Sequence, residues 1–214
     1  DLVKSKTTTF IGTFHRSEIA KLCGDCHADA EQIHKANARL PLDQSSQYRD
    51  SVHGKRMAAG DEAAATCIDC HGLHDIRKVT DPQAPVAALQ QPDTCGRCHS
   101  NPEIMAGRNL PVDQVAKYRK GGHWGWLTRR GEPPAARCSS CHGDHDVAPA
   151  KTKLSDVTCQ PCHGEPLEVY EDRAHWSIEP VERQKRCVGC HGNHMVNWLP
   201  VNRRRGDGGL QQGK

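Results

Sequence analysis

Residues 67–74 read Cys67-Ile68-Asp69-Cys70-His71-Gly72-Leu73-His74, with two cysteines three positions apart and a histidine directly after them. Two thiols about one helical turn apart can form thioethers to the two vinyl groups of one haem, and the adjacent imidazole can then bind its iron. This stretch therefore predicts a site for covalent attachment of haem.

The same C-x-x-C-H motif accounts for every cysteine in the chain of 214 residues. The six pairs are Cys23 and Cys26, Cys67 and Cys70, Cys95 and Cys98, Cys138 and Cys141, Cys159 and Cys162, and Cys187 and Cys190. The histidines that follow them are His27, His71, His99, His142, His163 and His191. We therefore predict six covalent haem c groups, each held by two thioethers and one imidazole.

Two other classes of protein also carry paired cysteines, namely zinc proteins with C-x-x-C knuckles and disulfide-stabilised scaffolds. Neither class explains a histidine directly after every pair. Leu, Ile, Val and Phe make up only 34 of the 214 residues, which is too few for an ordinary core. Porphyrin faces would supply the missing apolar interior, so composition favours haem as well.

Eight further histidines lie outside the motifs, and six of them recur in a pattern. Three follow a motif histidine by three residues, and these are His74, His145 and His194. Three others follow a tyrosine by five residues, and these are His53, His123 and His175. We predict that these six are the second axial ligands of the irons, because a solvated histidine has no reason to recur in this way. An iron held by two imidazoles has no open position for a substrate and suits electron transfer.

The motifs divide the chain into three repeated dihaem units, each reading C-x-x-C-H, then Tyr-x4-His, then C-x-x-C-H-G-x-H. The first unit spans 23–75, the second 95–147 and the third 159–195. We expect one hexahaem body over 1–214, with an N-terminal arm at 1–22 and a flexible basic and glycine-rich tail at 202–214.

The expected fold class is mostly irregular loop with short α-helices, almost no β-structure and a haem core. Ser17 can cap a helix that runs into Cys23, and further helices are predicted over 28–39, 44–52, 112–119 and 166–174.

At the two ends of the repeat, the order of the motifs does not show which histidine binds which haem iron. His74 and His145 are each followed by another motif, to which they can reach forward, whereas no motif follows His194. We therefore expect His15 or His194 to cross to a neighbouring copy of the chain and bind iron there. In the alternative, His15, His34 or His194 completes the first haem site within one chain, and His34 is otherwise simply exposed.

Residues 48–54, 67–76 and 94–99 resemble the multihaem c-type cytochromes with doubled C-x-x-C-H motifs, and the resemblance covers residues 23–195. It implies that the haems are attached outside the cytoplasmic membrane and pack as alternating parallel and perpendicular pairs along one electron path. Some extracellular members of the wider group polymerise into conducting filaments, with ligands donated across subunits. The third unit departs from the pattern, because Tyr170 follows Cys159 by only 11 residues.

These observations predict an electron carrier and not an enzyme. In the alternative, the chain is a reductase of a small oxyanion such as nitrite or tetrathionate, but such an enzyme needs a haem with an open axial position. An accessory subunit of a quinol oxidase is a third possibility. Within the carrier class, a filament subunit is favoured over a monomeric periplasmic shuttle.

The expected partners are further copies of the same chain in a head-to-tail polymer, redox partner proteins and extracellular electron acceptors. The formal net charge of +3 gives no reason to expect nucleic acid as a partner. No apolar run approaches the roughly 18 residues of a transmembrane segment. We expect the protein outside the cell or at its surface, and otherwise in the periplasm.

Overall fold

The computed structural model describes residues 15–130, 136–148, 159, 162–163, 191–192 and 194–196. Across these residues the chain forms short helices and loops and no strand, which confirms the predicted fold class. The elements that lead into and form the first unit are a 3-10 turn (Arg16–Glu18), α1 (Ile19–His27), α2 (Ala30–Ala36), α3 (Gln44–Asp50), α4 (Val52–Ala58) and α5 (Cys67–His71). Those of the second unit are α6 (Gln91–His99), α7 (Pro102–Met105), α8 (Gln114–Lys120), α9 (Gly122–Arg130) and α10 (Cys138–His142).

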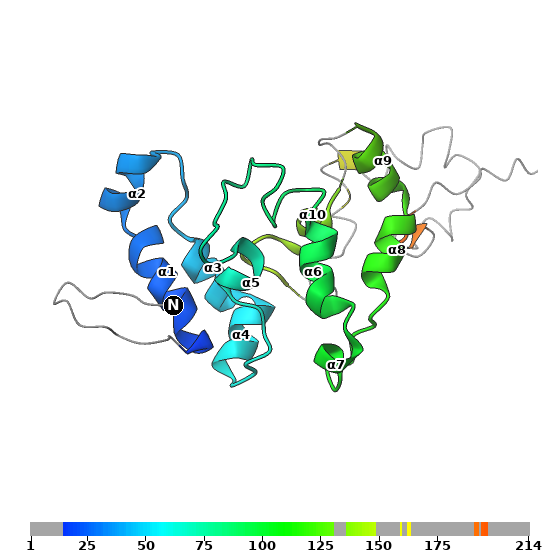
Figure 1. The fold of residues 1–214 in the computed structure, drawn as a ribbon, viewed down its shortest axis with the longest axis horizontal. Coiled ribbons are helices and arrows are strands. Elements are labelled where there is room, and N and C mark those ends of the chain that lie inside the picture. Colours follow the sequence, from blue (N-terminus) through cyan, green and yellow to red (C-terminus); the bar gives the residue numbers. More distant parts are fainter. Residues whose placement is uncertain are drawn as a thin grey trace, which may run out of the picture.

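The two sets of helices follow the same order. α1 and α6 each end at the histidine of a C-x-x-C-H motif, and α5 and α10 each consist of such a motif. In the first unit α3 packs on both α1 and α4, and in the second α8 packs in the same way on α6 and α9. Figure 1 shows α1 to α5 on one side of the molecule and α6 to α9 on the other, with α6 facing α5.

Side-chain caps begin several of these helices. The carboxylate of Asp29 accepts hydrogen bonds from the backbone N–H groups at the start of α2, and the side chain of Asn101 does the same for α7. The hydroxyl of Ser51 accepts a hydrogen bond from the N–H of Gly54 at 3.0 Å and so starts α4. These small polar residues explain why many short helices form in so little sequence.

The helix boundaries differ from the predicted ones in three places. Ser17 lies inside the 3-10 turn and does not cap α1, which continues through the motif to His27. The helix predicted over 28–39 is shorter, because Asp29 caps it and Asn37 is extended. The helix predicted over 44–52 ends at Asp50, after which Ser51 starts a second helix.

The predicted helix over 112–119 corresponds to α8, shifted by one or two residues. The predicted helix over 166–174 and the tail at 202–214 lie outside the described residues, as do residues 1–14 of the N-terminal arm.

Few large side chains are buried, as the low content of apolar residues predicts. Leu127 and Ala84 are fully buried, and Ile19, Met57 and Met105 are nearly so. The buried positions of Met57 and Met105 fit a packing role. Among the helices described, none has the length and apolar character needed to cross a membrane.

Candidate haem centres

Histidines from distant parts of the chain meet in four pairs. In each pair, one ring belongs to a C-x-x-C-H motif and the other to a predicted second ligand. The ring centres are separated by 6.2 Å for His53 and His99, 6.0 Å for His71 and His145, 6.1 Å for His123 and His163, and 6.0 Å for His142 and His194.

This spacing fits two axial ligands on opposite sides of one metal ion. A bond from a metal to an imidazole nitrogen is about 2 Å long, so two opposed nitrogens lie about 4 Å apart and the ring centres about 6 Å apart. The observed separations of 6.0 to 6.2 Å match this requirement in all four pairs. Among the described residues, no group of three or more His, Cys, Asp or Glu side chains converges as a zinc site would require.

The angle between the ring planes follows the repeat. Where the motif is the second of its unit, the rings are nearly parallel, at 9° for His71 and His145 and 14° for His142 and His194. Where the motif is the first of its unit, the rings are tilted, at 45° in the pair containing His99 and 42° in the pair containing His163. The angle between the two rings of a pair therefore depends on whether the motif is the first or the second of its unit.

The surroundings of the paired rings favour neutral imidazole, which is the form that binds a metal. Burial, together with the charge of His99, lowers the pKa of His53 to about 4. Burial followed by the charge of the opposite ring also lowers the pKa of His71, His123 and His194. These side chains are therefore ready to ligate at neutral pH.

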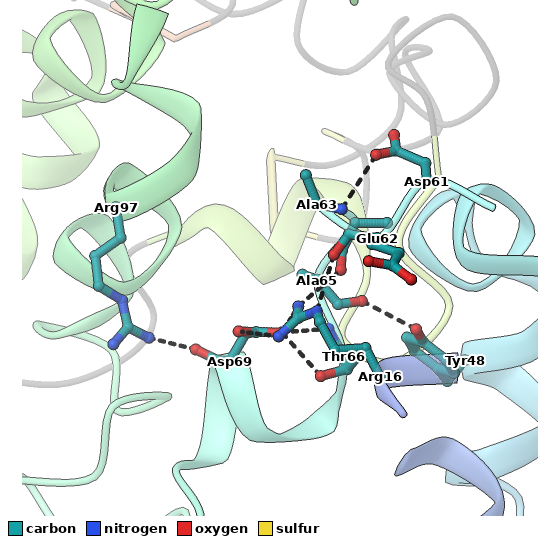
Figure 2. Close-up of polar contacts among 10 residues, drawn as sticks. Arg16, Tyr48, Asp61, Glu62, Ala63, Ala65, Thr66, Asp69 and Arg97 are labelled. Carbon is teal, nitrogen blue, oxygen red and sulfur yellow. Dashed lines mark hydrogen bonds and ion pairs between the residues drawn. The ribbon is translucent and has the colours of Figure 1, made fainter. Parts of the chain in front are cut away.

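The repeated tyrosine positions the histidine that follows it. His53 and His123 are each the second residue of a helix, α4 and α9. The hydroxyl of Tyr48 donates a hydrogen bond to the carbonyl of Ala65 at 3.0 Å, as Figure 2 shows. Tyr118 donates in the same way to the carbonyl of Ala136 at 2.9 Å. Each tyrosine thus joins the helix before its histidine to the segment that enters the next C-x-x-C-H motif.

A cluster of polar groups holds the motif at 67–71 against Arg16 of the 3-10 turn (Figure 2). The guanidinium of Arg16 donates to the carboxylate of Asp69 at 2.6 Å and to the carbonyl of Ala64 at 3.1 Å. The same carboxylate accepts hydrogen bonds from the backbone N–H and the hydroxyl of Thr66, at 2.7 and 2.8 Å. Arg97 of α6 donates to the carbonyl of Asp69 and so connects the first unit to the second.

A sharp turn follows the second motif of every unit. Gly72, Gly143 and Gly192 have φ angles of +81°, +86° and +76°, in the region that only glycine adopts without strain. Two residues after each of the histidines His145 and His194, a backbone carbonyl accepts a hydrogen bond from the helix of the preceding unit. These bonds run from the N–H of Val52 to Val147 at 2.8 Å and from the N–H of Gly122 to Val196 at 2.7 Å.

Two predictions about the direction of these histidines are wrong. His145 was expected to reach forward towards the motif at Cys159, yet its ring lies against His71 in the preceding unit. His194 was expected to cross to another chain or, in the alternative, to complete the first haem site, yet it lies against His142. The glycine turn reverses the chain, and the hydrogen bond to the preceding unit holds each histidine there.

Successive attachment sites lie next to each other. The sulfur atoms of Cys23 and Cys67 lie within hydrogen-bond distance, as do those of Cys95 and Cys138, so the two motifs adjoin in each of the first two units. Cys70 also lies near Cys95, and Cys141 near Cys159, so neighbouring units adjoin as well. Each of the first five motifs therefore lies next to another motif of this set.

The remaining predicted ligands are placed as follows. His27 is exposed but near enough to His71 for its charge to lower the pKa of that ring. His15 and His34 are exposed, and neither meets another imidazole among the described residues. His74 is exposed and His191 half-buried. Three predicted site residues, Cys187, Cys190 and His175, lie outside the described residues.

Sequence reasoning missed the tyrosine hydroxyl contacts and the backbone hydrogen bonds to Val147 and Val196. A signal for the hydroxyl contacts exists, because Ala65 and Ala136 each stand two residues before the first cysteine of a motif.

Comparison with known proteins gives a match between residues 133–201 and the family model described as Cytochrome c3. The matched segment is about a third of the chain and contains the motifs that begin at Cys138, Cys159 and Cys187. No curated protein and no solved structure matches the chain. The family match supports a multihaem c-type cytochrome that binds haem iron covalently and transfers electrons.

Proposed function

We propose that the chain binds six haems, each iron between two histidines, and passes electrons along them as the subunit of an extracellular cytochrome filament. The four histidine pairs with ring centres 6.0 to 6.2 Å apart carry this proposal. Haem iron held between two imidazoles takes up and releases an electron without changing its ligands.

The order of the attachment sites supports transfer along the first five motifs. Within each of the first two units, the first cysteines of the two motifs lie close together, and between units the second motif lies beside the first motif of the next. The chain's own residues thus hold neighbouring sites at fixed separations, which is what an electron path needs.

The same geometry argues against a reductase. Such an enzyme needs an axial position that a substrate can occupy, but the rings of His99, His71, His163 and His142 each face a second imidazole. A substrate at any of these four positions would have to displace a histidine held by its helix or turn.

The proposal of a location outside the cell or at its surface rests on covalent haem attachment and on the resemblance described above. The proposal of a filament rests on the repeat itself. Neighbouring units exchange histidines in both directions, and a surface that joins one unit to the next can join copies of the chain in the same way. Electrons would then pass from copy to copy and on to redox partner proteins or extracellular acceptors.

Haem counting and spin-state measurement on the purified protein test the function. We expect six covalent haems per chain, from the mass of the denatured protein and the pyridine spectrum, and only low-spin ferric iron in the assembled protein. Four or fewer haems per chain, or a high-spin signal from the assembled protein, would overturn the proposal. Turnover of nitrite or tetrathionate with a reduced dye would favour the reductase.

A further inference from the structure

A group of ion-paired side chains begins on the helix that carries His53. Arg56 follows this histidine by three residues in α4, so the two side chains leave the same face of the helix. The guanidinium of Arg56 donates to the carboxylate of Asp61 at 3.2 Å, shortly after α4 ends. Asp61 is therefore held against the helix that supplies one of the two imidazoles facing each other at His53 and His99.

The other side of this group comes from the segment that follows His99. Arg108, nine residues after that histidine, donates to the same carboxylate of Asp61 at 2.5 Å. Its side chain is 19% exposed, against 44% for Arg56. Arg56, Asp61 and Arg108 together form the arginine cluster. Asp61 thus joins the helix of His53 to the segment after His99, across the boundary between the first and second units.

The loop that carries Arg108 has an unusual backbone. Gly107 and Asn109, on either side of it, have φ angles of +72° and +52°. Among the described residues, Asn109 is the only one other than glycine with a positive φ. The Arg108 guanidinium also donates to the carbonyl of Ile104 within the same loop. A left-handed conformation costs free energy at a residue other than glycine, and it persists where the surrounding contacts fix a functional side chain in one place.

The arginine cluster carries an excess of positive charge, because two guanidiniums share one carboxylate. Burial and then the charge of His99 lower the pKa of His53, and the charge of Arg56 acts in the same direction. The charge of Asp69 opposes this effect, but that carboxylate is itself paired with Arg16. Positive charge from the cluster therefore acts on the ring of His53.

We propose that the arginine cluster raises the reduction potential of the iron bound between His53 and His99, with Asp61 as the residue that positions both guanidiniums. The inference rests on the proposed function, in which this iron takes up one electron from a neighbouring haem and passes it on. The ferric site loses one unit of positive charge when it is reduced. Nearby positive charge therefore favours the reduced form.

The other pair of tilted rings does not repeat these charges. The ring planes of His123 and His163 make an angle of 42°, close to the 45° of the first pair. The residues three and eight positions after His123 are Trp126 and Gly131, where the first pair has an arginine and an aspartate of the cluster. Two sites with similar ligand geometry thus differ in these charges, so an electron should favour the first site over the second.

Charge-changing variants of the holoprotein test the inference. Electron paramagnetic resonance of ferric wild type and of His53→Ala identifies the low-spin signal of this iron, because that signal is lost in the variant. Redox titration then follows the same signal. We expect a lower potential in Arg56→Gln and Arg108→Gln, which remove positive charge, and a higher potential in Asp61→Asn. A shift of about threefold in the equilibrium constant for reduction corresponds to about 30 mV.

Two further variants are the controls. Lys55→Gln removes a positive charge from an exposed neighbour of Arg56, but Lys55 stands two residues from His53 and so on another face of α4. It should leave the potential as in wild type, and so should Asp61→Glu, which keeps the carboxylate. Loosening of the structure alone would shift Arg56→Gln and Asp61→Asn in the same direction. Opposite shifts therefore identify the effect of charge.

Three results would overturn the inference. These are shifts of the same sign in Arg56→Gln and Asp61→Asn, no shift in either, and an equal shift in Lys55→Gln. Haem per chain is measured by mass for every variant. If Asp61→Asn takes up fewer than six haems, the two arginine variants decide, since both should lower the potential while Lys55→Gln does not, and an unchanged potential in both contradicts the inference.

Failure of this inference is distinguishable from failure of the proposed function. If wild type carries six low-spin haems and His53→Ala loses one low-spin signal, the proposed function stands whichever way the potentials shift. If His53→Ala keeps every low-spin signal, His53 is not a ligand. In that case the inference fails together with this ligand assignment, whereas the haem count still decides whether the chain is a hexahaem cytochrome.

Discussion

The imidazoles of His71 and His145 lie 6.0 Å apart and within 9° of parallel, although one belongs to the first unit and the other to the second. Two rings that meet across the boundary between units join those units directly. In the proposed haem site, bonds from both rings to one iron would also hold the two units together, which a chain with so few buried apolar side chains needs.

Replacing His145 by alanine should remove one of these bonds only. Cys67 and Cys70 keep the haem attached and His71 keeps one side of the iron, so we expect six haems by mass and one high-spin iron per chain. Electron paramagnetic resonance of the ferric protein measures this. His34→Ala, at an exposed position on α2, should leave the spectrum as in wild type. An unchanged spectrum for His145→Ala would contradict the assignment.

The tyrosine hydroxyls predict a loss of stability in alkali. Burial is the main cause that raises the pKa of Tyr48 and of Tyr118 to about 12, whereas an unfolded tyrosine ionises near 10. The two tyrosines make their full contribution to the free energy of unfolding below pH 10. This contribution is lost as the pH rises through 12, because between pH 10 and 12 only the tyrosines of the unfolded chain ionise.

Tyr48→Phe and Tyr118→Phe should each lower the free energy of unfolding by about 1 kcal/mol at pH 8, since a partly buried carbonyl loses its donor. Denaturant unfolding of wild type and of the double variant between pH 8 and 12 tests both statements. The difference in free energy of unfolding between wild type and the double variant should shrink above pH 10. A constant difference would show that the hydroxyls are not buried in the folded protein.

The ion pairs of Asp61 predict the opposite pH dependence. Burial raises the pKa of this carboxyl, but Arg108 and Arg56 outweigh that effect and hold it below 3.8. Asp61 makes its full contribution to the free energy of unfolding when the pH is above the usual pKa of a carboxyl group. This contribution is lost as the pH falls through the lowered pKa of Asp61. Asp61→Asn should cost about 0.5 to 1 kcal/mol at pH 7 in thermal unfolding.

The difference between wild type and Asp61→Asn should disappear in acid. Asp50→Asn, at an exposed carboxyl at the end of α3, is the control and should have little effect at any pH. If Asp61→Asn matches this control at pH 7, the contact with Arg108 does not stabilise the loop between α7 and α8.

The sequence predicts haem attachment sites from chemistry that is local. A C-x-x-C-H motif places two thiols and an imidazole within one turn of helix, whatever surrounds it. The repeat also predicts six second ligands, and four of these histidines, His53, His123, His145 and His194, do face motif histidines.

The pairing of ligands could not be predicted, since it depends on the direction in which each turn leaves its helix. Sequence order suggested that His145 reaches forward, whereas the left-handed Gly143 sends it back towards His71. The start of α4 at Ser51 was missed for a similar reason, because the serine both ends one helical run and caps the next.

Replacing His123 by alanine should leave the proposed iron at His163 with one imidazole, because the rings of His123 and His163 face each other at 6.1 Å. Cys159 and Cys162 still hold that haem, so we expect six haems by mass and one high-spin iron per chain. Electron paramagnetic resonance of the ferric protein measures the change, and His34→Ala, at an exposed position, is the control. A spectrum identical to that of wild type would show that a histidine other than His123 binds the iron at His163.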